Sequence, residues 1–276
     1  MSTMLEARPR SGPWRPTPAV AASIGLHGLA VASLLVAPQG WPWALGAMAA
    51  NQLVLGATGL LPRTNWIGPN MTRLPPAARE RCEIAITLDD GPDPEVTPRV
   101  LDLLAERGCV ATFFCIGERV LAHADLCREI VRRGHAVENH SMRHGPTFAL
   151  QTLAGYRREL RSAQDALARV TGSEPRFFRA PMGFRNPLLD PVLHELGLTL
   201  AAWTRRSYDT RVRDPAVVTA RLTRRFAAGD ILLLHDGHAA RTAAGTPVLL
   251  EALPRILDAA QGLGLRPVTL RHAVDS

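Results

Sequence analysis

Two long uncharged stretches stand near the start of the chain. Residues 19–37 and residues 43–61 contain no charged side chain, and each has about the 17–25 residues that an α-helix needs to cross a bilayer. Both stretches are rich in Ala and Gly, which lets two helices pack closely. The pattern predicts a two-helix transmembrane hairpin over residues 19–62.

The charges on either side of this hairpin orient it. Arginines occur in the polar tail, residues 1–18, and in the linker, residues 63–82, but not between them. Because basic flanks stay in the cytoplasm, we expect a multi-pass protein of a bacterial inner membrane, with a cytoplasmic catalytic domain and membrane lipid as a partner. The alternatives are a secretory signal peptide and a pair of buried soluble helices. The length of the first stretch and the presence of a second one count against both.

The larger polar side chains within the apolar stretches are His27, Asn51 and Gln52. Polar groups inside a membrane need partners, and neighbouring helices supply them. We expect these side chains to form hydrogen bonds between the two hairpin helices.

From residue 83 onward, β-prone apolar runs alternate with helical patterns. The apolar runs predict strands at residues 83–90, 109–117, 136–140, 176–183, 198–204, 230–236 and 266–270. Helical periodicity predicts helices at residues 96–107, 121–133, 153–170, 187–196, 215–227 and 248–263. Glycines suited to ending a helix follow these segments, at positions 108, 134, 172, 197, 229 and 264.

This alternation predicts the fold. Repeated β–α units imply parallel strands joined by right-handed crossovers. About seven units follow one another without a glycine-rich dinucleotide fingerprint, which favours a barrel over an open doubly wound sheet. We therefore expect an α/β fold, a distorted (β/α)7-type barrel over residues 83–272, preceded by the membrane hairpin.

Composition narrows the function. The chain has 276 residues, a formal net charge of +7 and 32 basic residues, all of them arginine. Without lysine it can hold neither a Walker-type phosphate loop nor a Schiff-base site. No nucleic-acid motif accompanies the basic residues, so no nucleic-acid partner is expected. The cysteines show no C-x-x-C spacing and are expected to be reduced structural residues: Cys82, Cys109, Cys115 and Cys127.

Two motifs carry candidate chemistry. Asp89 and Asp90 close the first predicted strand before a Gly-Pro turn, and His140 and His144 follow the third. Histidines four apart share a face when one helical turn holds them. One carboxylate and two imidazoles suit a metal ion, and the second carboxylate is left to handle a proton, as in a metal-assisted hydrolase. Taken singly, each motif could be a turn or a surface pair; their combination favours a site.

Three further polar residues fall at strand ends. Arg179 lies near the end of the fourth predicted strand, Asp209 just beyond the fifth and His235 at the end of the sixth. In an α/β barrel the carboxyl ends of the strands form the rim where active sites are built. We expect these side chains to meet the two motifs at that rim.

At these residues the sequence resembles the polysaccharide deacetylase family, also called the NodB-homology or carbohydrate esterase family 4 domain. The resemblance covers about residues 83–272. Motifs match in order: Asp-Asp-Gly-Pro from residue 89, His-Ser-Met-Arg-His from residue 140, Arg-Ala-Pro-Met-Gly from residue 179 and Leu-Leu-His from residue 233. The resemblance implies a barrel-like fold and hydrolysis of an acyl group on an amino sugar.

The match also implies roles for single residues. Asp89 corresponds to the catalytic base, Arg179 to the residue that orients this base, and His235 to the acid that protonates the leaving group. The implied metal ligands are Asp90, His140 and His144.

One motif departs from the family pattern. Trp203 is present, but Arg206 stands where the family commonly has an acid and Thr210 where it has a second tryptophan. Asp209 keeps the position that hydrogen-bonds the catalytic histidine; the alternative is a loop carboxylate paired with Arg205, Arg206 or Arg211. The implied substrate-binding residues are Pro181, Gly183 and Trp203, with Met182 where an aromatic residue is usual.

The sequence thus predicts a metal-dependent hydrolase that removes an N-acyl group, acetyl or formyl, from an amino sugar that is lipid-linked or a glycan precursor. The expected cofactor is one divalent ion, Zn²⁺ first, with Co²⁺, Ni²⁺, Fe²⁺ or Mn²⁺ as alternatives. Two other functions stay open: an outward-facing peptidoglycan or exopolysaccharide N-deacetylase, and a non-catalytic sugar-binding relative.

Overall fold

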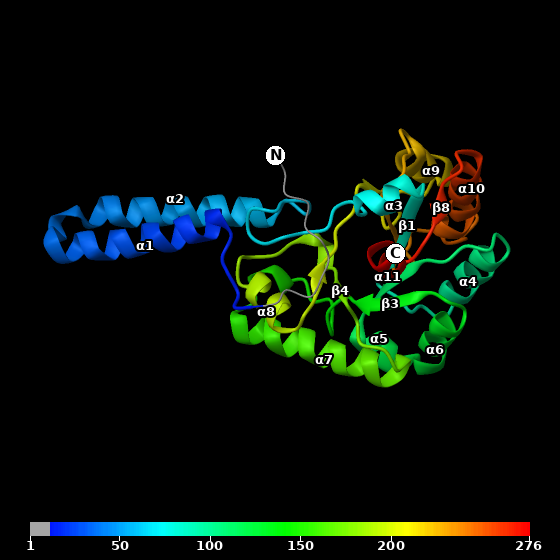
Figure 1. Ribbon diagram of the computed structural model, residues 1–276, viewed down its shortest axis with the longest axis horizontal. Coiled ribbons are helices and arrows are strands. Elements are labelled where there is room, and N and C mark those ends of the chain that lie inside the picture. The colour runs from blue at the N-terminus through cyan, green and yellow to red at the C-terminus, as the bar shows by residue number, and fades with distance from the viewer. Residues whose placement is uncertain (1–11) are drawn as a thin grey trace.

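The computed structural model describes residues 12–276, so most of the expected polar tail lies outside the described residues. Helix α1 (Pro18–Val36) and helix α2 (Trp41–Gly59) run antiparallel, joined by the short 3-10 turn η1 (Pro38–Gly40). Together they form a hairpin that extends away from the remainder of the chain (Figure 1). The expected two-helix hairpin is therefore present as a structure.

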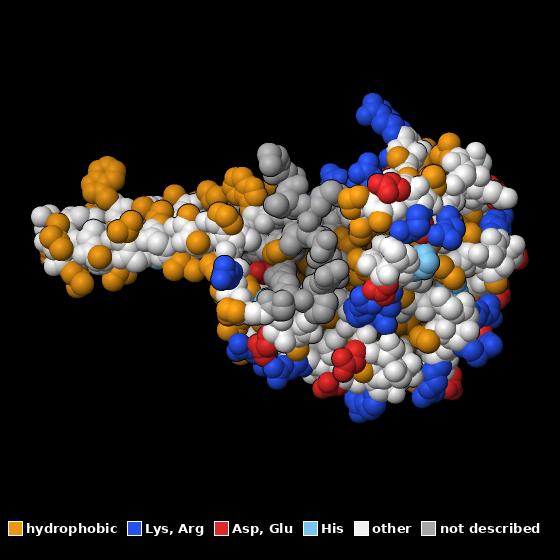
Figure 2. All heavy atoms as spheres, viewed as in Figure 1, with side chains coloured by type: hydrophobic (Ala, Val, Ile, Leu, Met, Phe, Trp, Pro, Cys, Tyr) orange, Lys and Arg blue, Asp and Glu red, His pale blue; other side chains and the backbone are white. Residues whose placement is uncertain are grey.

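The hairpin surface is apolar along its length. In Figure 2 it is orange and white, whereas blue and red side chains gather on the domain and at the hairpin's base. Within the described residues, α1 alone is long and apolar enough to cross a membrane, with a mean hydropathy of 2.0 and 17% of its window buried. A membrane span by α2 stays a prediction.

Polar side chains join the two hairpin helices. The Asn51 side-chain amide donates a hydrogen bond to the Ser23 hydroxyl at 2.7 Å. One helical turn away, Gln52 Nε2 lies 3.2 Å from His27 Nε2. The expected hydrogen bonds between the helices are confirmed.

The domain is built on one parallel sheet with the strand order β5-β4-β3-β2-β1-β7-β6, and β8 pairs with the start of β1. The strands are β1 (Glu83–Asp89), β2 (Thr112–Cys115), β3 (Ala136–Asn139), β4 (Phe177–Phe178), β5 (Thr199–Leu200), β6 (Arg205–Arg206), β7 (Ile231–His235) and β8 (Arg266–Pro267). The predicted parallel α/β architecture is confirmed. Within the described residues β5 and β6 do not pair, so the sheet curls without closing, and the prediction of a barrel is corrected to a half-barrel.

The strand predicted over residues 198–204 was wrong in extent. The chain leaves the sheet after Leu200 and re-enters it at Arg205 as β6. Between these strands Ala201 forms an isolated parallel bridge with Met71 of the segment that follows the hairpin. This bridge supplies hydrogen bonds that a sheet neighbour would otherwise provide, so a two-residue strand is sufficient here.

Helices connect the strands and cover the sheet (Figure 1). They are α3 (Pro76–Glu80), α4 (Thr97–Ala105), α5 (Gly117–Ala122), α6 (Ala124–Arg132), α7 (Leu153–Thr171), α8 (Leu189–Glu195), α9 (Pro215–Thr223), α10 (Val248–Gly262) and α11 (Leu270–Asp275). All six glycines predicted to follow helices have positive φ, between 59° and 85°. The helix predicted over 121–133 instead begins at Gly117 and breaks at His123, whose φ of −128° is not helical.

The hydrophobic core fixes the strand ends that carry the polar residues. All seven residues of β1 are buried, and its apolar side chains pack with those of β7, α4 and α10. Burial of a large aliphatic side chain contributes roughly 1.5–3 kcal/mol. All four cysteines are free thiols, as expected.

The exit of the hairpin is bound to the loop after β4. Gly59 accepts a backbone hydrogen bond from Arg185 at 3.1 Å, and the Arg185 guanidinium donates to the carbonyl oxygens of Thr64 and Gly68 at 2.7 and 3.2 Å. A Cβ atom on Gly59 would lie 2.1 Å from the Arg185 carbonyl oxygen, so only glycine fits this contact. The hairpin is therefore held next to the loop that carries Pro181 and Gly183.

Candidate active site

A carboxylate and two imidazoles converge beyond the ends of β1 and β3. Asp90 follows β1 in a left-handed conformation, with φ of 72°, and His140 follows β3 directly. The candidate ligand atoms of Asp90, His140 and His144 all lie within 4.8 Å of one another. The structure thus brings together the three residues that the sequence suggested for a metal.

The two histidines do not share a helix face, so the helical-turn reasoning was wrong. Residues 140–145 form a loop, and Ser141 and His144 both have positive φ, 66° and 53°. Side chains fold this loop: the Asn139 side-chain oxygen Oδ1 accepts from Ser141 N at 2.8 Å, and the Ser141 hydroxyl accepts from His144 N at 2.9 Å. The imidazole rings end 4.9 Å apart between centroids.

The cluster fits a divalent cation. Asp90 Oδ1 is buried, lacks a hydrogen-bond partner within the described residues, and lies 3.3 Å from Nε2 of both His140 and His144. Two ligands of a tetrahedral Zn²⁺, each about 2.1 Å from the ion, stand about 3.4 Å apart. His140 Nδ1 donates to the Arg179 carbonyl oxygen at 2.8 Å, which leaves the Nε2 lone pair free for a metal.

The charge states of two of the ligands, Asp90 and His144, suit a metal as well. Burial alone would raise the pKa of Asp90, but the neighbouring imidazoles of His140, His238 and His235 hold it well below its usual range. Burial would lower the pKa of His140, but Asp89 and Asp90 raise it, so metal binding there must displace a proton. Burial, followed by repulsion from His140, lowers the pKa of His144 to about 4. A carboxylate and a neutral imidazole are the forms that bind metals.

Asp89, the last residue of β1, forms a buried ion pair with Arg179. The guanidinium NH1 donates to Asp89 Oδ1 at 2.6 Å and to the Thr87 hydroxyl at 2.7 Å. Burial lowers the pKa of Arg179 and the Asp89 carboxylate opposes this. The guanidinium also lies 4.1 Å from the centroid of the Phe114 ring. Asp89 is therefore fixed with its second oxygen toward the histidines, 3.8 Å from His140 Nε2.

His235, the last residue of β7, is paired with Asp209. Its Nδ1 lies 2.7 Å from Asp209 Oδ1, and its backbone N donates to Oδ2 at 2.8 Å. Burial would lower the pKa of His235, but the Asp209 carboxylate outweighs it and raises the pKa to about 9. Asp209 bonds Ser207 and His235 rather than an arginine, which answers the alternative pairing with Arg205, Arg206 or Arg211.

Comparison with known proteins places this geometry in a family. A family model described as polysaccharide deacetylase matches residues 77–201. The chain is 34% identical over 212 residues to the chitooligosaccharide deacetylase of Azorhizobium caulinodans, covering 72% of this chain and 100% of that protein. This chain belongs to the polysaccharide deacetylase family. The resemblance drawn from the motifs is confirmed.

Two other relatives show how far the likeness reaches. The peptidoglycan-N-acetylglucosamine deacetylase PgdA of Listeria monocytogenes is 33% identical over 172 residues, which is 62% of this chain and 36% of that protein. The chain thus spans about a third of the length of that relative. The family 4 carbohydrate esterase from Streptomyces lividans, solved in complex with acetate, has 31% identity and a TM-score of 0.61, over 67% of this chain and 91% of that one.

The family motifs surround an open cavity of about 140 Å³, which we call the catalytic pocket. Of the implied sugar-binding residues, Gly183 and Trp203 line it, whereas Pro181 is buried and is not among its lining residues. The wall also contains side chains to which sequence reasoning gave no role in binding: Met182, Arg206, Thr210 and Arg211. For three of these four, a departure from the family motifs was the available signal: Met182 in the third motif, and Arg206 and Thr210 in the fourth.

His238 lies at the edge of the same pocket. Its Nδ1 is 3.4 Å from Asp90 Oδ2, and its Nε2 is 3.0 Å from Arg119 NH2. Its side chain is 60% exposed, and it is not among the residues that line the catalytic pocket.

Proposed function

We propose that this chain is a metal-dependent N-deacetylase that hydrolyses the N-acyl group, acetyl or formyl, of an amino sugar. One observation carries the proposal: a three-residue metal cluster lies beside a carboxylate paired with a buried arginine and an imidazole paired with a buried carboxylate. A sugar-binding protein that does no chemistry needs neither pair. The retained pairs therefore count against a non-catalytic relative.

The metal site would be formed by Asp90, His140 and His144. A divalent ion there would polarise the amide carbonyl and lower the pKa of a water molecule toward about 7. Zn²⁺ suits the two imidazoles and one carboxylate, and Co²⁺, Ni²⁺, Fe²⁺ and Mn²⁺ can use the same donors.

Asp89 is the proposed base. Arg179 holds one carboxylate oxygen, so the other, Oδ2, faces the metal cluster. From that position it takes a proton from the attacking water as the water oxygen bonds to the carbonyl carbon. Arg179 also keeps the carboxylate from rotating, because its remaining donors are fixed to the carbonyl oxygens of Ala201 and Ala202.

His235 is the proposed acid. Its Nδ1 is held by Asp209, so the proton that it gives away leaves from Nε2. When the carbon–nitrogen bond breaks, this proton goes to the departing amine. The products are a free amino sugar and acetate or formate.

The position of the hairpin supports a substrate at the membrane. Gly183 lines the catalytic pocket, and a Cβ atom on it would lie 2.7 Å from Pro62 Cβ and 2.7 Å from Trp203 Cη2. The segment that leaves the hairpin thus contacts the wall of the pocket. Large apolar side chains at the hairpin's exit are exposed: Leu60, Leu61 and Trp66. We infer that the pocket opens close to the lipid surface and receives a lipid-linked amino sugar or glycan precursor.

A test of the reaction uses the full chain purified in detergent. Reloading the protein with Zn²⁺ after chelation should restore acetate release from N-acetylglucosamine oligosaccharides, and the Asp89→Asn variant should stay inactive while holding the metal. Acetate release by chelated protein would contradict the metal mechanism. No release from any acylated amino sugar by metal-loaded protein would favour the binding function.

The side of the membrane on which the domain lies determines whether the substrate is a lipid-linked precursor or the cell wall. The arginine-bearing flanks favour a cytoplasmic domain, whereas the name of the Listeria relative favours peptidoglycan and an outward-facing domain. Reporters fused after Ser276 separate them. A bright cytoplasmic fluorophore with an inactive periplasmic phosphatase supports the lipid-linked precursor, and the reverse pattern supports the peptidoglycan substrate.

A further inference from the structure

A second cavity lies between the catalytic pocket and the exit of the hairpin. Its volume is about 420 Å³, and we call it the hairpin-side cavity. It shares Trp203 and Arg206 with the catalytic pocket. The remaining lining residues are Leu60, Pro62, Arg63, Phe184, Thr204 and Tyr208. A ligand that fills the catalytic pocket can therefore continue past Arg206 into the hairpin-side cavity.

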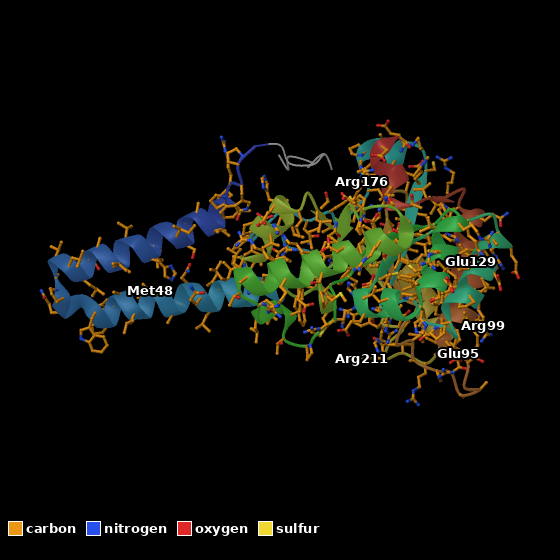
Figure 3. The ribbon with its side chains drawn as sticks, turned by 90° about the horizontal axis from the view of Figure 1, so that it is seen from below. Met48, Glu95, Arg99, Glu129, Arg176 and Arg211 are labelled. Atoms are coloured by element: carbon orange, nitrogen blue, oxygen red, sulfur yellow. The ribbon has the colours of Figure 1, made fainter. Side chains whose placement is uncertain are left out.

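Three arginines border these two cavities without a counter-charge. Within residues 12–276, Arg63, Arg206 and Arg211 form no ion pair, and Arg63 donates only to the Thr204 carbonyl oxygen at 3.2 Å. Figure 3 labels Arg211 on the domain, nearer to the hairpin than Glu95 in that view. Asp209 pairs with His235 and Asp230 with Arg205. The two acids that line the catalytic pocket, Asp89 and Asp90, lie against Arg179 and His140.

Arg206 is the most constrained of the three. Its guanidinium lies 5.4 Å from the centroid of the Trp203 ring and 4.8 Å from that of Tyr208. Its Nε is buried and has no hydrogen-bond partner within the described residues. A buried donor without an acceptor is costly, and a guanidinium whose freedom is limited by two aromatic neighbours suits a two-pronged hydrogen bond to phosphate.

We propose that the hairpin-side cavity is a phosphate site. It binds the phosphoryl group of a glycosyl phosphate or pyrophosphate, while the N-acyl sugar of the same molecule occupies the catalytic pocket. This inference rests on the proposed deacetylase function and adds the substrate class. A neutral glycan needs no guanidinium here, and the acid that the family commonly has at position 206 would repel a phosphate. Leu60 and Pro62 on the far wall favour a lipid as the group beyond the phosphate.

Binding measured on the inactive Asp89→Asn protein tests the phosphate site without turnover. With metal-loaded protein in phosphatidylcholine nanodiscs, N-acetylglucosamine 1-phosphate should bind at least about tenfold more tightly than N-acetylglucosamine. Adding Arg206→Gln or Arg63→Gln should reduce that ratio by about tenfold each. Arg213→Gln, an exposed arginine that lines neither cavity, is the matched control and should keep the ratio.

The active protein distinguishes the two sources of phosphate. A lipid source predicts a kcat/KM at least about tenfold higher for N-acetylglucosamine linked to polyprenyl pyrophosphate than for the corresponding sugar nucleotide. The opposite ranking assigns the same phosphate site to a soluble sugar nucleotide. Failure of the deacetylase proposal would appear as no acetate release from any substrate, which is independent of the binding ratio. Equal binding of the phosphorylated and neutral sugars, or a ratio that survives both Arg206→Gln and Arg63→Gln, would overturn the inference.

Discussion

The pairing of His235 with Asp209 makes the pH dependence of the reaction predictable. The imidazole is protonated below its pKa. His235 can therefore donate a proton below about pH 9, and it loses this ability as the pH rises through that value. Asp209→Asn keeps the shape of the side chain and removes the charge. The rise from the ordinary pKa of 6.5 to about 9 corresponds to about 3 kcal/mol of interaction with the imidazolium. Without that charge, burial lowers the pKa of His235 while only Asp89 and Asp90 raise it, so we expect the pKa to fall toward its ordinary value of 6.5.

The expected loss of activity follows from the fraction of protonated imidazole. At about pH 7.5, a pKa of about 9 leaves His235 almost fully protonated, whereas a pKa of 6.5 leaves roughly a tenth of it in the acid form. The kcat/KM of the Asp209→Asn variant should therefore fall by at least about tenfold at this pH. The alkaline limb of its pH–rate profile should move from near pH 9 toward pH 6.5.

The assay is acetate release across pH 5–10, roughly the range that brackets both values, with metal content measured at each pH. The matched control is Asp230→Asn, which changes an equally buried carboxylate that pairs with Arg205 outside the pocket. It should lose stability but keep its alkaline limb near 9. An alkaline limb near 9 in Asp209→Asn would refute the reasoning, since another group would then be the acid.

Three further predictions follow from other contacts. Asp90→Ala and His144→Ala should lose bound metal in elemental analysis, whereas Asp89→Asn should keep it and lose about 10²–10⁴-fold in kcat; metal loss in Asp89→Asn would make Asp89 a ligand. Arg179→Gln leaves Asp89 buried without its partner and should lower the free energy of unfolding of the domain by about 3–5 kcal/mol in denaturant titrations, and a change below about 1 kcal/mol would contradict the ion pair. Gly59→Ala places a Cβ atom 2.1 Å from the Arg185 carbonyl oxygen, so the exit of the hairpin should become cleavable in limited proteolysis. Gly56→Ala, where an added Cβ atom meets nothing within 4 Å, should leave the exit protected. Equal protection in both variants would disprove the contact between the hairpin's exit and the loop after β4.

Features set by local chemistry could be predicted from the sequence. Glycine at positions 108, 134, 172, 197, 229 and 264 ends a helix or precedes a strand with positive φ in every case, because only glycine adopts that backbone without strain. The polar residues at the strand ends could also be predicted. Apolar runs that stop at a carboxylate or an imidazole placed Asp89 and His235 at the same rim. The structure adds that the sheet register pairs these two residues.

Features set by contacts between distant segments could not be predicted. The four-residue spacing of His140 and His144 indicated a helical turn, but Asn139 and Ser141 fold the segment into a loop through side-chain hydrogen bonds. The barrel could not be distinguished from a half-barrel, because closure depends on pairing between β5 and β6 rather than on the number of units. The contact of Pro62 with Gly183 joins positions far apart in the sequence, and no local sequence pattern predicts it.

Two buried ion pairs explain how one small pocket can hold a base and an acid at the same pH. Asp89 and His235 are neighbours across β1 and β7, and each is held by a separate partner of opposite charge. Arg179 binds Asp89 and Asp209 binds His235, and each partner is itself almost completely buried. Opposite environments of this kind are what separates the roles of two titratable groups in an active site. The pairing of β1 with β7 sets the distance between base and acid, whereas their partners come from the loop after β4 and the loop after β6, so four strands together position the two catalytic groups.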